Sequence, residues 1–518
     1  MKACHSNGLH RPSRLAITLV CAAGLWMQAI ADDGTARSGV ESPPVTWTES
    51  DLVLPRYGAI AIYRPSGPIR AVVIFLSGDG GWHLGVVDAA RRFAAAGALV
   101  AGVDVRKYLG LIRPGDTGSD PAACISVAGD MEALSQQLQR RLQLPGYLHP
   151  LLVGYSSGAT IVYAALAQAP HGTFSGAISM GFCPDQDFGG ARLCKSNGLD
   201  YHLPEKIRTG DHTLILDANR TVRDPWIAAQ GERDQVCNPD VTRAFAAAIP
   251  AARLLSLPRV GHGFSVTANW WPQVRQAYQD AVAHTTPPAP TDSSISDLPV
   301  YEVPAGDRQS DRLAILLTGD GGWAGLDQDL SAELARQGIS VAALSSVRYF
   351  WHARSPEQSA ADVTRLIDHF LPAWHAHRVL LIGYSFGADA LPFIWNRLPQ
   401  RVQERVDSLS LLGLSATANF EIRVAGWLPG AGAGELATLP ELQRSTGVPL
   451  LCVYGSGEFD SLCPSLQMAG ATSVLIGSGH HFGGQATAIV AAILRVAGSR
   501  APRAAGEQLM PQSAPSSP

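Results

Sequence analysis

"LLIGYSFGADALP", residues 380–392, sets a serine between two glycines, after an apolar run and before a helix-like one. A G-x-S-x-G match alone is weak, but a strand-turn-helix setting is what a nucleophile elbow requires. The glycines permit the sharp turn that would leave the hydroxyl of Ser385 exposed above a sheet. "LLVGYSSGATIVY", residues 151–163, repeats the pattern around Ser156. The chain therefore carries two candidate nucleophiles.

The rest of the chain also repeats once. Three further blocks recur in the same order: "GDGGW" (78–82 and 319–323), "GERDQVC" (231–237) as "GEFDSLC" (457–463), and "GHGF" (261–264) as "GHHF" (479–482). Four matched blocks in one order predict two copies of a single domain.

Within each copy, short apolar runs alternate with helical patterns. The apolar runs include 71–76 and 379–382, and the helical patterns include 326–338 and 359–371. This alternation predicts the α/β class, with a mainly parallel sheet covered by helices on both faces. Such sheets bind ligands beyond the carboxyl ends of their strands, where the repeated blocks would meet.

Composition marks the predicted boundaries. The length of 518 residues, 46% of them apolar, favours two domains over one. We predict an N-terminal domain over 45–284 and a C-terminal domain over 299–498. The Pro/Ser/Thr-rich stretch 285–298 is typical of a linker, and 499–518 of a disordered tail.

The first segment predicts export. Residues 1–31 carry three basic residues and no acid, followed by an apolar run over 15–30. This pattern is typical of a secretory signal peptide cleaved after Ala31. A retained membrane anchor is disfavoured because the run is short and ends in A-x-A. Lipidation at Cys21 is disfavoured because Val20 precedes it.

Charge argues against nucleic acid as a partner. The formal net charge of −4 becomes −7 when the three basic residues leave with the signal peptide. No cluster of Lys or Arg remains to follow a phosphate backbone.

Six cysteines remain after cleavage, and an even number in an exported chain favours disulfides. Metal binding is the lesser interpretation, because no C-x-x-C spacing occurs. Sequence proximity suggests the pairs Cys183–Cys194 and Cys452–Cys463, which would leave Cys124 for Cys237.

A serine nucleophile needs a base, and the base needs an acid that fixes its tautomer. In this fold class the expected chain order is Ser, Asp, His. The second copy offers Ser385, Asp460 and His480, and the first offers Ser156, Asp234 and His262.

The second copy has two adjacent histidines, so the base has to be chosen. We predict His480 rather than His481, because the single histidine of "GHGF", His262, matches His480. One buried histidine often serves structure alone. Three roles in the right order, found twice, favour catalysis.

The "GDGGW" block follows the first strong strand of each copy, where an oxyanion-hole loop would stand. We predict donors near Gly321 and Phe386 in the second copy, and near Gly80 and Ser157 in the first. A tight glycine turn with its tryptophan packed on the core is the structural alternative, and both can hold together.

The aspartate of this block is unusual beside a developing oxyanion, because its charge opposes catalysis unless it faces a cation. Asp320 therefore suggests a positively charged substrate. Asp389, after the elbow, and Glu458, beside Asp460, extend this acidic rim. We predict that Asp320 and Asp389 bind the substrate. The alternative for such a rim is a solvated helix start.

"LLTGDGGWAGLDQDL", "IGYSFGADALPF" and "GSGHHF", with the duplication, resemble the AcvB/VirJ family of bacterial virulence proteins. The second copy resembles the VirJ domain. The resemblance implies an α/β-hydrolase fold, a periplasmic location, no metal or organic cofactor, and a link to type IV secretion. It also implies hydrolysis of the aminoacyl ester of the membrane lipid lysyl-phosphatidylglycerol, with Ser385, Asp460 and His480 in the active site.

Two other functions fit the sequence. The fold could serve as a non-catalytic scaffold or chaperone for secretion components, or as an esterase of different specificity.

Overall fold

The computed structural model describes residues 46–54, 57–83, 85–112, 124–205, 212–285, 294–306, 310–422, 435–458, 460–466 and 471–499. The predicted signal peptide, most of the predicted linker and nearly all of the predicted tail lie outside these ranges. The described residues all belong to one compact unit. The boundaries of the two copies within it stay predictions.

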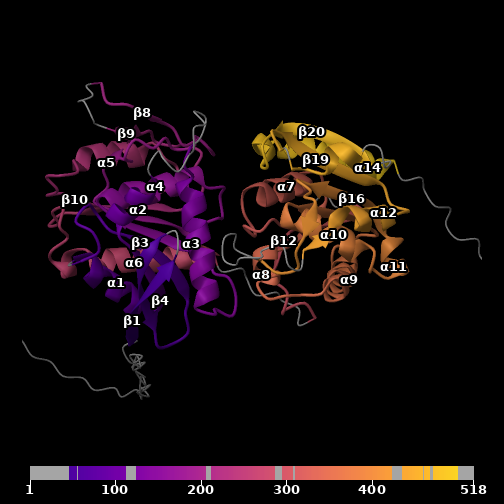
Figure 1. Ribbon diagram of the computed structural model, residues 1–518, viewed down its shortest axis with the longest axis horizontal. Helices are drawn as coiled ribbons and strands as arrows, with labels where there is room; N and C mark the ends of the chain where they lie inside the picture. Colours follow the sequence, from indigo (N-terminus) through magenta and orange to yellow (C-terminus); the bar gives the residue numbers. More distant parts are fainter. Residues whose placement is uncertain are drawn as a thin grey trace, which may run out of the picture. The chain divides into compact units, whose positions relative to one another are not determined.

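The first half of the chain builds an eight-stranded sheet in the order β1-β2-β4-β3-β5-β6-β10-β11 (Figure 1). The first three strands in this order pair antiparallel, and all later pairs are parallel. This is the strand order of the α/β-hydrolase fold. The strands are β1 (Trp47–Leu54), β2 (Gly58–Pro65), β3 (Ala71–Leu76), β4 (Ala98–Val103), β5 (Leu151–Tyr155), β6 (Gly176–Met180), β10 (Trp226–Gly231) and β11 (Ala252–Leu257).

The second half repeats the sheet with seven strands in the order β12-β14-β13-β15-β16-β19-β20. Only the β12–β14 pair is antiparallel. The strands are β12 (Val300–Val303), β13 (Arg312–Leu317), β14 (Ser340–Leu344), β15 (Arg378–Tyr384), β16 (Val406–Leu412), β19 (Leu450–Ser456) and β20 (Thr472–Ser478). Small antiparallel additions are β7 (Asp185–Asp187), β8 (Tyr201–His202) and β9 (Thr213–Leu216) in the first half, and β17 (Thr417–Ala418) with β18 (Leu436–Ala437) in the second.

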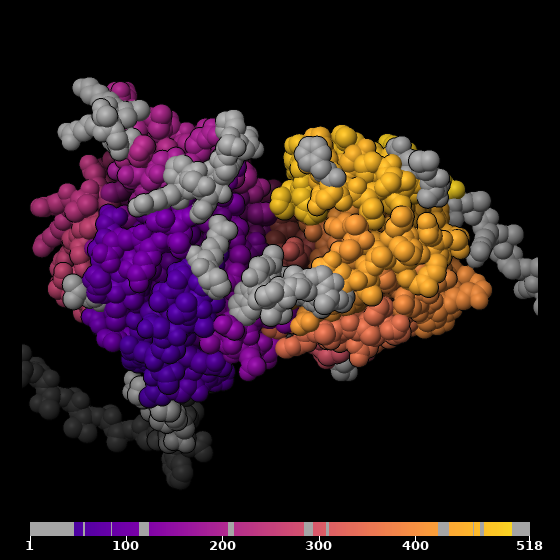
Figure 2. Space-filling model, in the orientation of Figure 1, coloured from indigo at the N-terminus to yellow at the C-terminus, as the bar shows by residue number. Residues whose placement is uncertain are grey.

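Helices connect the parallel strands. The first half has α1 (Gly85–Ala95), α2 (Val105–Leu111), α3 (Val127–Arg141), α4 (Ser157–Gln168), α5 (Pro239–Ala247) and α6 (Trp271–Thr285). The second has α7 (Gly325–Arg336), α8 (Ser346–Tyr349), α9 (Pro356–Ala373), α10 (Phe386–Trp395), α11 (Gln400–Gln403), α12 (Thr438–Arg444), α13 (Cys463–Leu466) and α14 (Ala486–Gly498). In Figure 2 the yellow atoms, which belong to the last part of the chain, lie together on the surface of the second half. Within the described ranges, every helix is too short or too polar to cross a membrane.

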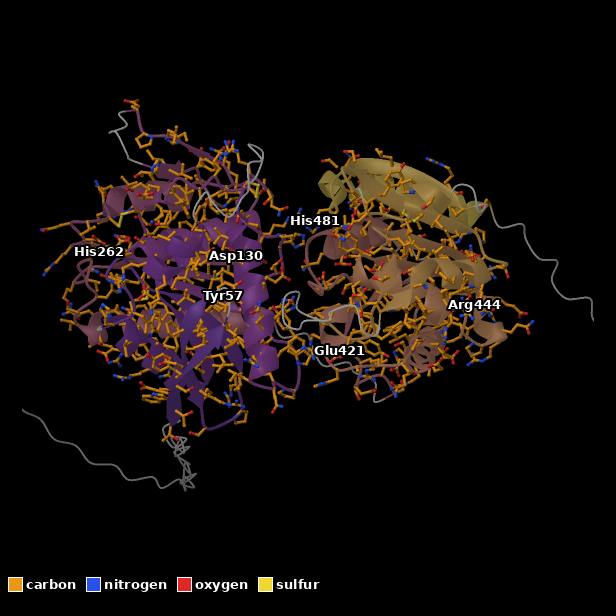
Figure 3. All side chains as sticks on the ribbon, viewed as in Figure 1. Tyr57, Asp130, His262, Glu421, Arg444 and His481 are labelled. Atoms are coloured by element: carbon orange, nitrogen blue, oxygen red, sulfur yellow. A yellow bond between two sulfur atoms is a disulfide. The ribbon has the colours of Figure 1, made fainter. Side chains whose placement is uncertain are left out.

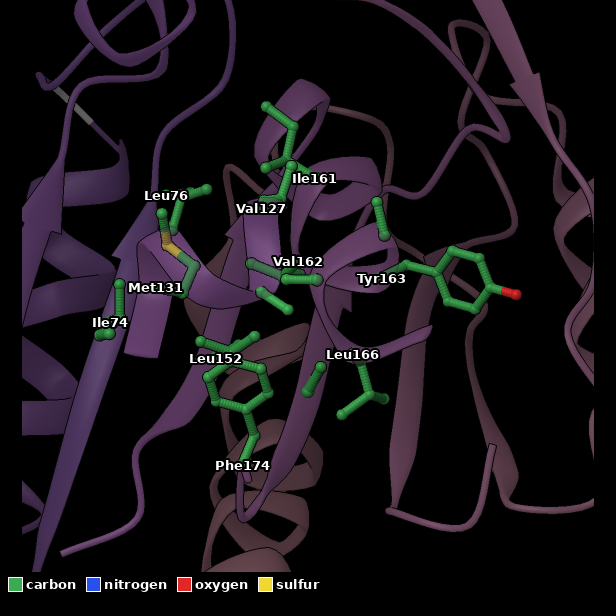
Figure 4. Close-up of a cluster of buried hydrophobic side chains, with 14 of the residues drawn as sticks. Ile74, Leu76, Val127, Met131, Leu152, Ile161, Val162, Tyr163, Leu166 and Phe174 are labelled. Atoms are coloured by element: carbon green, nitrogen blue, oxygen red, sulfur yellow. The ribbon is translucent and has the colours of Figure 1, made fainter. Parts of the chain in front are cut away.

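Both sheets are covered on both faces, as the sequence predicts. In β3, Val72, Ile74 and Leu76 belong to a buried cluster with α3 and α4, part of which Figure 4 shows. The alternate residues, such as Val73 and Phe75, belong to a second cluster with α1 and α6. Side chains alternate between the faces of a strand, so a strand that is apolar throughout requires a cover on each side.

The disulfides correct two of the three suggested pairs. The bonds are Cys124–Cys194, Cys183–Cys237 and Cys452–Cys463, so only the last was predicted correctly. Cys183 follows β6 and Cys237 follows β10, and these two strands are neighbours in the sheet. Proximity in the sequence misled the prediction, because parallel pairing brings distant strand ends together.

Candidate functional site

Both serines stand on strained turns between a strand and a helix. Ser385 joins β15 to α10 with φ 52° and ψ −119°, and Ser156 joins β5 to α4 with φ 53° and ψ −123°. A residue other than glycine adopts this backbone conformation only at a cost of about 1–3 kcal/mol. Residues held in this way cluster at functional turns. Each serine is therefore held on the nucleophile elbow that the sequence predicts.

The flanking glycines are required by close backbone packing. A Cβ atom on Gly387 would lie 2.2 Å from the carbonyl oxygen of Leu317, and one on Gly383 would lie 2.4 Å from the oxygen of Gly387. The equivalent distance for Gly158, to the oxygen of Leu76, is 2.3 Å. The helix after each serine thus lies directly against the central strand, which positions the hydroxyl at the end of the sheet.

In the second half, a histidine and a carboxylate complete a triad with Ser385. His480 Nε2 lies 2.8 Å from Ser385 Oγ. His480 Nδ1 pairs with Oε1 of Glu458, whose other oxygen accepts the N–H of Gly455 at 2.7 Å. The side chain of Glu458 is 7% exposed and that of His480 is 42% exposed. A carboxylate at Nδ1 fixes the tautomer in which Nε2 can take the serine proton.

The acid of this triad is not the predicted Asp460. Asp460 is exposed, and it acts electrostatically on Asp389 instead. Aligning "GERDQVC" with "GEFDSLC" by their letters placed Asp460 opposite Asp234, the acid of the first half. The structure aligns them differently.

In both halves the acid stands three residues after the glycine that ends the buried part of its strand. The N–H of Asp234 donates to the oxygen of Gly231 at 3.2 Å, and the N–H of Glu458 donates to that of Gly455 at 3.3 Å. "GERD" therefore corresponds to "GSGE", residues 455–458, and two extra residues precede the second cysteine. The longer glutamate side chain reaches His480 from this position.

The first half has a complete triad made of the predicted residues. His262 Nε2 lies 3.0 Å from Ser156 Oγ, and His262 Nδ1 lies 2.9 Å from Asp234 Oδ2 (His262 is labelled in Figure 3). Asp234 has a fully buried side chain, and its Oδ1 accepts the N–H groups of Val236 and Cys237 at 2.9 Å. These bonds fix the carboxylate toward the histidine.

His481, the neighbour of the base, has a different partner. Its Nδ1 lies 2.7 Å from the hydroxyl of Tyr384. Burial and the nearby His480 lower the pKa of His481 below its usual range. His481 therefore lines the site through its contact with Tyr384, while His480 contacts the nucleophile.

The glycine loop lies beside the nucleophile. The turn from Gly319 to Gly322 is closed by a 3.0 Å bond from Gly322 N to Gly319 O, and a Cβ on Gly319 would lie 3.5 Å from Ser385 Cβ. Phe386 is the first residue of α10, where backbone N–H groups lack helical acceptors. Gly321 and Phe386 remain the predicted oxyanion donors.

A cavity of about 520 Å³ contains Ser385 and His480. Three carboxylates line it: Asp320 in the glycine loop, Asp327 in α7 and Glu132 in α3. No Lys or Arg is present among the described residues of its wall. The cavity at the second serine is therefore acidic.

Two of these carboxylates carry the cost of burial. Asp327 is 2% exposed, and its Oδ1 has no hydrogen-bond partner within the described part of the chain. Burial raises the pKa of Asp327 well above its usual range, and burial with the charge of Asp320 raises that of Glu132 to about 7. A bound cation would relieve both effects.

Comparison with known families places the chain. It matches the family described as "Bacterial virulence protein (VirJ)" over residues 70–180 and 311–501, which is more than half of its length. The chain belongs to the VirJ family. No curated protein matches it.

Solved structures similar to this VirJ-family chain have low sequence identity. A putative dienelactone hydrolase from Klebsiella pneumoniae is 17% identical, with a TM-score of 0.31 and coverage of 46% of this chain and 97% of that one. A predicted CIB-like hydrolase from Thermoplasma acidophilum is 14% identical, with a TM-score of 0.29 and coverage of 46% and 99%. A Xanthomonas campestris protein, described as an α/β serine hydrolase without a lid, is 17% identical, with a TM-score of 0.29 and coverage of 48% and 98%.

Among the described residues of this VirJ-family chain, one group of three side chains has the composition of a metal site. Asp234, Cys237 and His262 lie close enough together to share an ion. Cys237 is bonded to Cys183, and a disulfide sulfur is not the thiolate that metals bind. The group is the acid and base of the first triad with a disulfide beside them.

Asp389, predicted to bind substrate, has a structural contact instead. Its Oδ1 accepts the N–H of Ser415 at 2.7 Å, and it is not among the residues that line the cavity at Ser385. Burial raises the pKa of Asp389 to about 8, so the side chain is mostly protonated at neutral pH. This corrects the prediction: Asp389 holds the loop after β16.

Replacing Asp389 with asparagine is expected to stabilise the protein at high pH. The folded-state pKa of about 8 exceeds the ordinary value of 3.8, so the folded state retains a proton that the unfolded chain loses. Wild-type stability should therefore fall as pH rises from about 4 to about 8, and the variant lacks this loss. Between pH 5 and pH 9 the unfolding free energy of the variant, measured by thermal unfolding, should therefore rise by about 4 kcal/mol relative to wild type, at about 1.4 kcal/mol for each pH unit from 5 to the folded-state pKa of about 8. If the difference in stability between the variant and wild type were the same at pH 5 and pH 9, the raised pKa assigned to Asp389 would be wrong.

Proposed function

We propose that the second half is a serine hydrolase that cleaves the aminoacyl ester of lysyl-phosphatidylglycerol. The observation that carries this proposal is the triad of Ser385, His480 and Glu458 opening into a cavity with three carboxylates. A buried carboxylate oxygen without a donor, such as Oδ1 of Asp327, is costly unless a ligand supplies one. The two ammonium groups of a lysyl ester are such donors, and the ester carbonyl lies between them and the lipid.

The reaction follows from the positions of the side chains. Ser385 Oγ attacks the lysyl carbonyl and passes its proton to His480 Nε2, while Glu458 stabilises the imidazolium. Backbone N–H groups at Phe386 and Gly321 would stabilise the oxyanion. His480 then protonates the departing glycerol oxygen, which releases phosphatidylglycerol and leaves lysyl-Ser385. Water, deprotonated by His480, attacks this ester and releases lysine.

We propose the periplasm as the location. The three disulfides fit an oxidising compartment, and the lipid headgroup is reached from the membrane surface. An association with type IV secretion components, implied by the family resemblance, belongs to the same proposal.

The test is to incubate the purified protein with vesicles of phosphatidylglycerol that contain lysyl-phosphatidylglycerol. Release of free lysine and phosphatidylglycerol, with acyl chains intact, is the expected result. If the wild-type protein binds these vesicles without releasing lysine, the hydrolase proposal fails and a binding function is favoured. Release of fatty acid instead would favour an esterase of other specificity.

The cavity acids should determine charge preference. Replacing Asp320 or Asp327 with asparagine is expected to lower kcat/KM for a lysyl ester about 10- to 100-fold, because one charged hydrogen bond contributes about 1.5–3 kcal/mol. In a Ser156→Ala background, hydrolysis of an uncharged ester at Ser385 should change less than threefold. Asp329→Asn is the matched control, because it removes a carboxylate that lies on the same helix but outside this cavity. Equal losses on both substrates would exclude charge recognition.

A further inference from the structure

A separate cavity lies beside the triad of the first half. This cavity holds about 280 Å³, and its wall includes Gly78 and Tyr155. A Cβ on Gly78 would lie 3.0 Å from Ser156 Cβ, and Tyr155 directly precedes the serine. Phe264, two residues after His262, lines the other side. The cavity therefore adjoins both the nucleophile and the base.

The wall of this cavity is apolar. Apart from its glycines and His83, it consists of Phe75, Val86, Ala89, Tyr155, Met180, Phe264 and Trp270. In the described part of the wall there is no carboxylate and no Lys or Arg. The volume lies just below that of typical ligand cavities, which span about 300–1,000 Å³. A small apolar group fits it, and a full lipid chain does not.

The acids near the glycine loop lie outside this cavity. Asp79 is exposed, accepts a hydrogen bond from the hydroxyl of Ser157 and is not among the residues that line the cavity. The guanidinium of Arg106 lies against Gly81 and pairs with Asp104 at 3.2 Å. In the second half Phe386 replaces Ser157, so Asp320 has no equivalent hydroxyl partner. The described wall of the first cavity thus offers no carboxylate to a cation.

One matched position separates the two cavities. Val86 stands eight residues after Gly78 and eleven before Gly97, which lies two residues after the end of helix α1. Asp327 stands eight residues after Gly319 and eleven before Gly338, which lies two residues after the end of α7. An apolar wall residue in the first half is therefore a buried carboxylate in the second, and the two sites favour substrates of different charge.

We propose that the first half is a second, independent esterase site for small uncharged esters with an apolar acyl group. Ser156 Oγ attacks the ester carbonyl as its proton passes to His262 Nε2. The bond from carbonyl carbon to alkoxy oxygen breaks, and His262 returns the proton to the alcohol. Water attacks the acyl-Ser156 ester, giving its proton to His262, which restores the serine as the acid leaves.

The test uses the full chain with Ser385→Ala, so that only Ser156 can act. This protein is expected to hydrolyse p-nitrophenyl butyrate, and the added Ser156→Ala change should lower the rate at least 100-fold. p-Nitrophenyl palmitate should be cleaved at least tenfold more slowly than the butyrate. A neutral butyl fluorophosphonate should label the peptide that contains Ser156.

Two variants test the cavity itself in the same Ser385→Ala protein. Val86→Asp should lower butyrate hydrolysis at least tenfold, because it places a carboxylate in the apolar wall. Val87→Asp is the matched control on the same helix and should retain most activity, since Val87 does not line the cavity. Ala89→Leu, which only removes volume, should favour acetate over butyrate esters even if Val86→Asp unfolds.

Two outcomes would overturn the proposal. The first is a Ser385→Ala protein that neither cleaves neutral esters nor carries label on Ser156. The second is cleavage of a lysine ester by Ser156 as fast as that of the butyrate. The proposal for the second half is judged separately, by whether lysine release from the lipid is lost when Ser385 is replaced in a Ser156→Ala background.

Discussion

Replacing Glu458 with glutamine is expected to lower kcat for hydrolysis at Ser385 about 10³- to 10⁴-fold, with little change in KM. The side chain pairs with His480 Nδ1, and Gly455 N–H binds its other oxygen. Glutamine keeps the shape but loses the charge that stabilises the imidazolium. It can also turn its amide toward Nδ1 and select the wrong histidine tautomer.

Asp460→Asn is the matched control for this experiment. Asp460 is only two residues away, is exposed, and has the side chain that sequence alignment favours as the acid. We expect its kcat to stay within about threefold of wild type, since distant surface charges act weakly through water. If Asp460→Asn lost activity and Glu458→Gln kept it, the triad assigned to the second half would be wrong.

Replacing Ser385 with alanine should lower lysyl-ester turnover about 10⁴- to 10⁶-fold, the largest effect expected of any substitution in the chain. The hydroxyl is the atom that forms the acyl-enzyme, so no neighbouring group substitutes for it. Lysine release from lipid vesicles measures the loss of turnover. If a fluorophosphonate no longer labels the peptide around position 385, the lost activity came from the Ser385 hydroxyl.

Folding provides the control for the alanine variant. Ser385 has no side-chain role in capping α10, so its thermal unfolding midpoint should stay close to that of wild type. Retained lysine release by a folded Ser385→Ala protein would place the chemistry elsewhere. Comparison with Ser385→Ala/Ser156→Ala would then show whether the first half performs it.

Much of the fold could be predicted from the sequence because its signals are local. The stretch around Ser385 encodes a buried strand, a glycine turn and a helix within thirteen residues, and the structure places β15 and α10 there. The apolar run 71–76 is β3 with the same bounds. The repeat of these blocks predicted two similar sheets, which the structure contains.

The acid and two disulfides could not be predicted in this way. Glu458 and Asp460 both follow the same strand, and only the path of the turn decides which of them faces His480. Cys183 and Cys237 are 54 residues apart, and their strands β6 and β10 meet only in the folded sheet. These contacts depend on tertiary geometry that no local pattern contains.

The sequence by itself determined the α/β class, the duplication and both Ser–His pairs, because strand, turn and helix propensities act over neighbouring residues. Only the tertiary structure decided which carboxylate serves His480 and how the cysteines pair. It also decided which side chains line the two cavities, in which Val86 and Asp327 occupy equivalent positions. The physical reason is that a cavity is made by side chains from separate elements, whose packing decides whether a charge is buried, paired or open to a ligand.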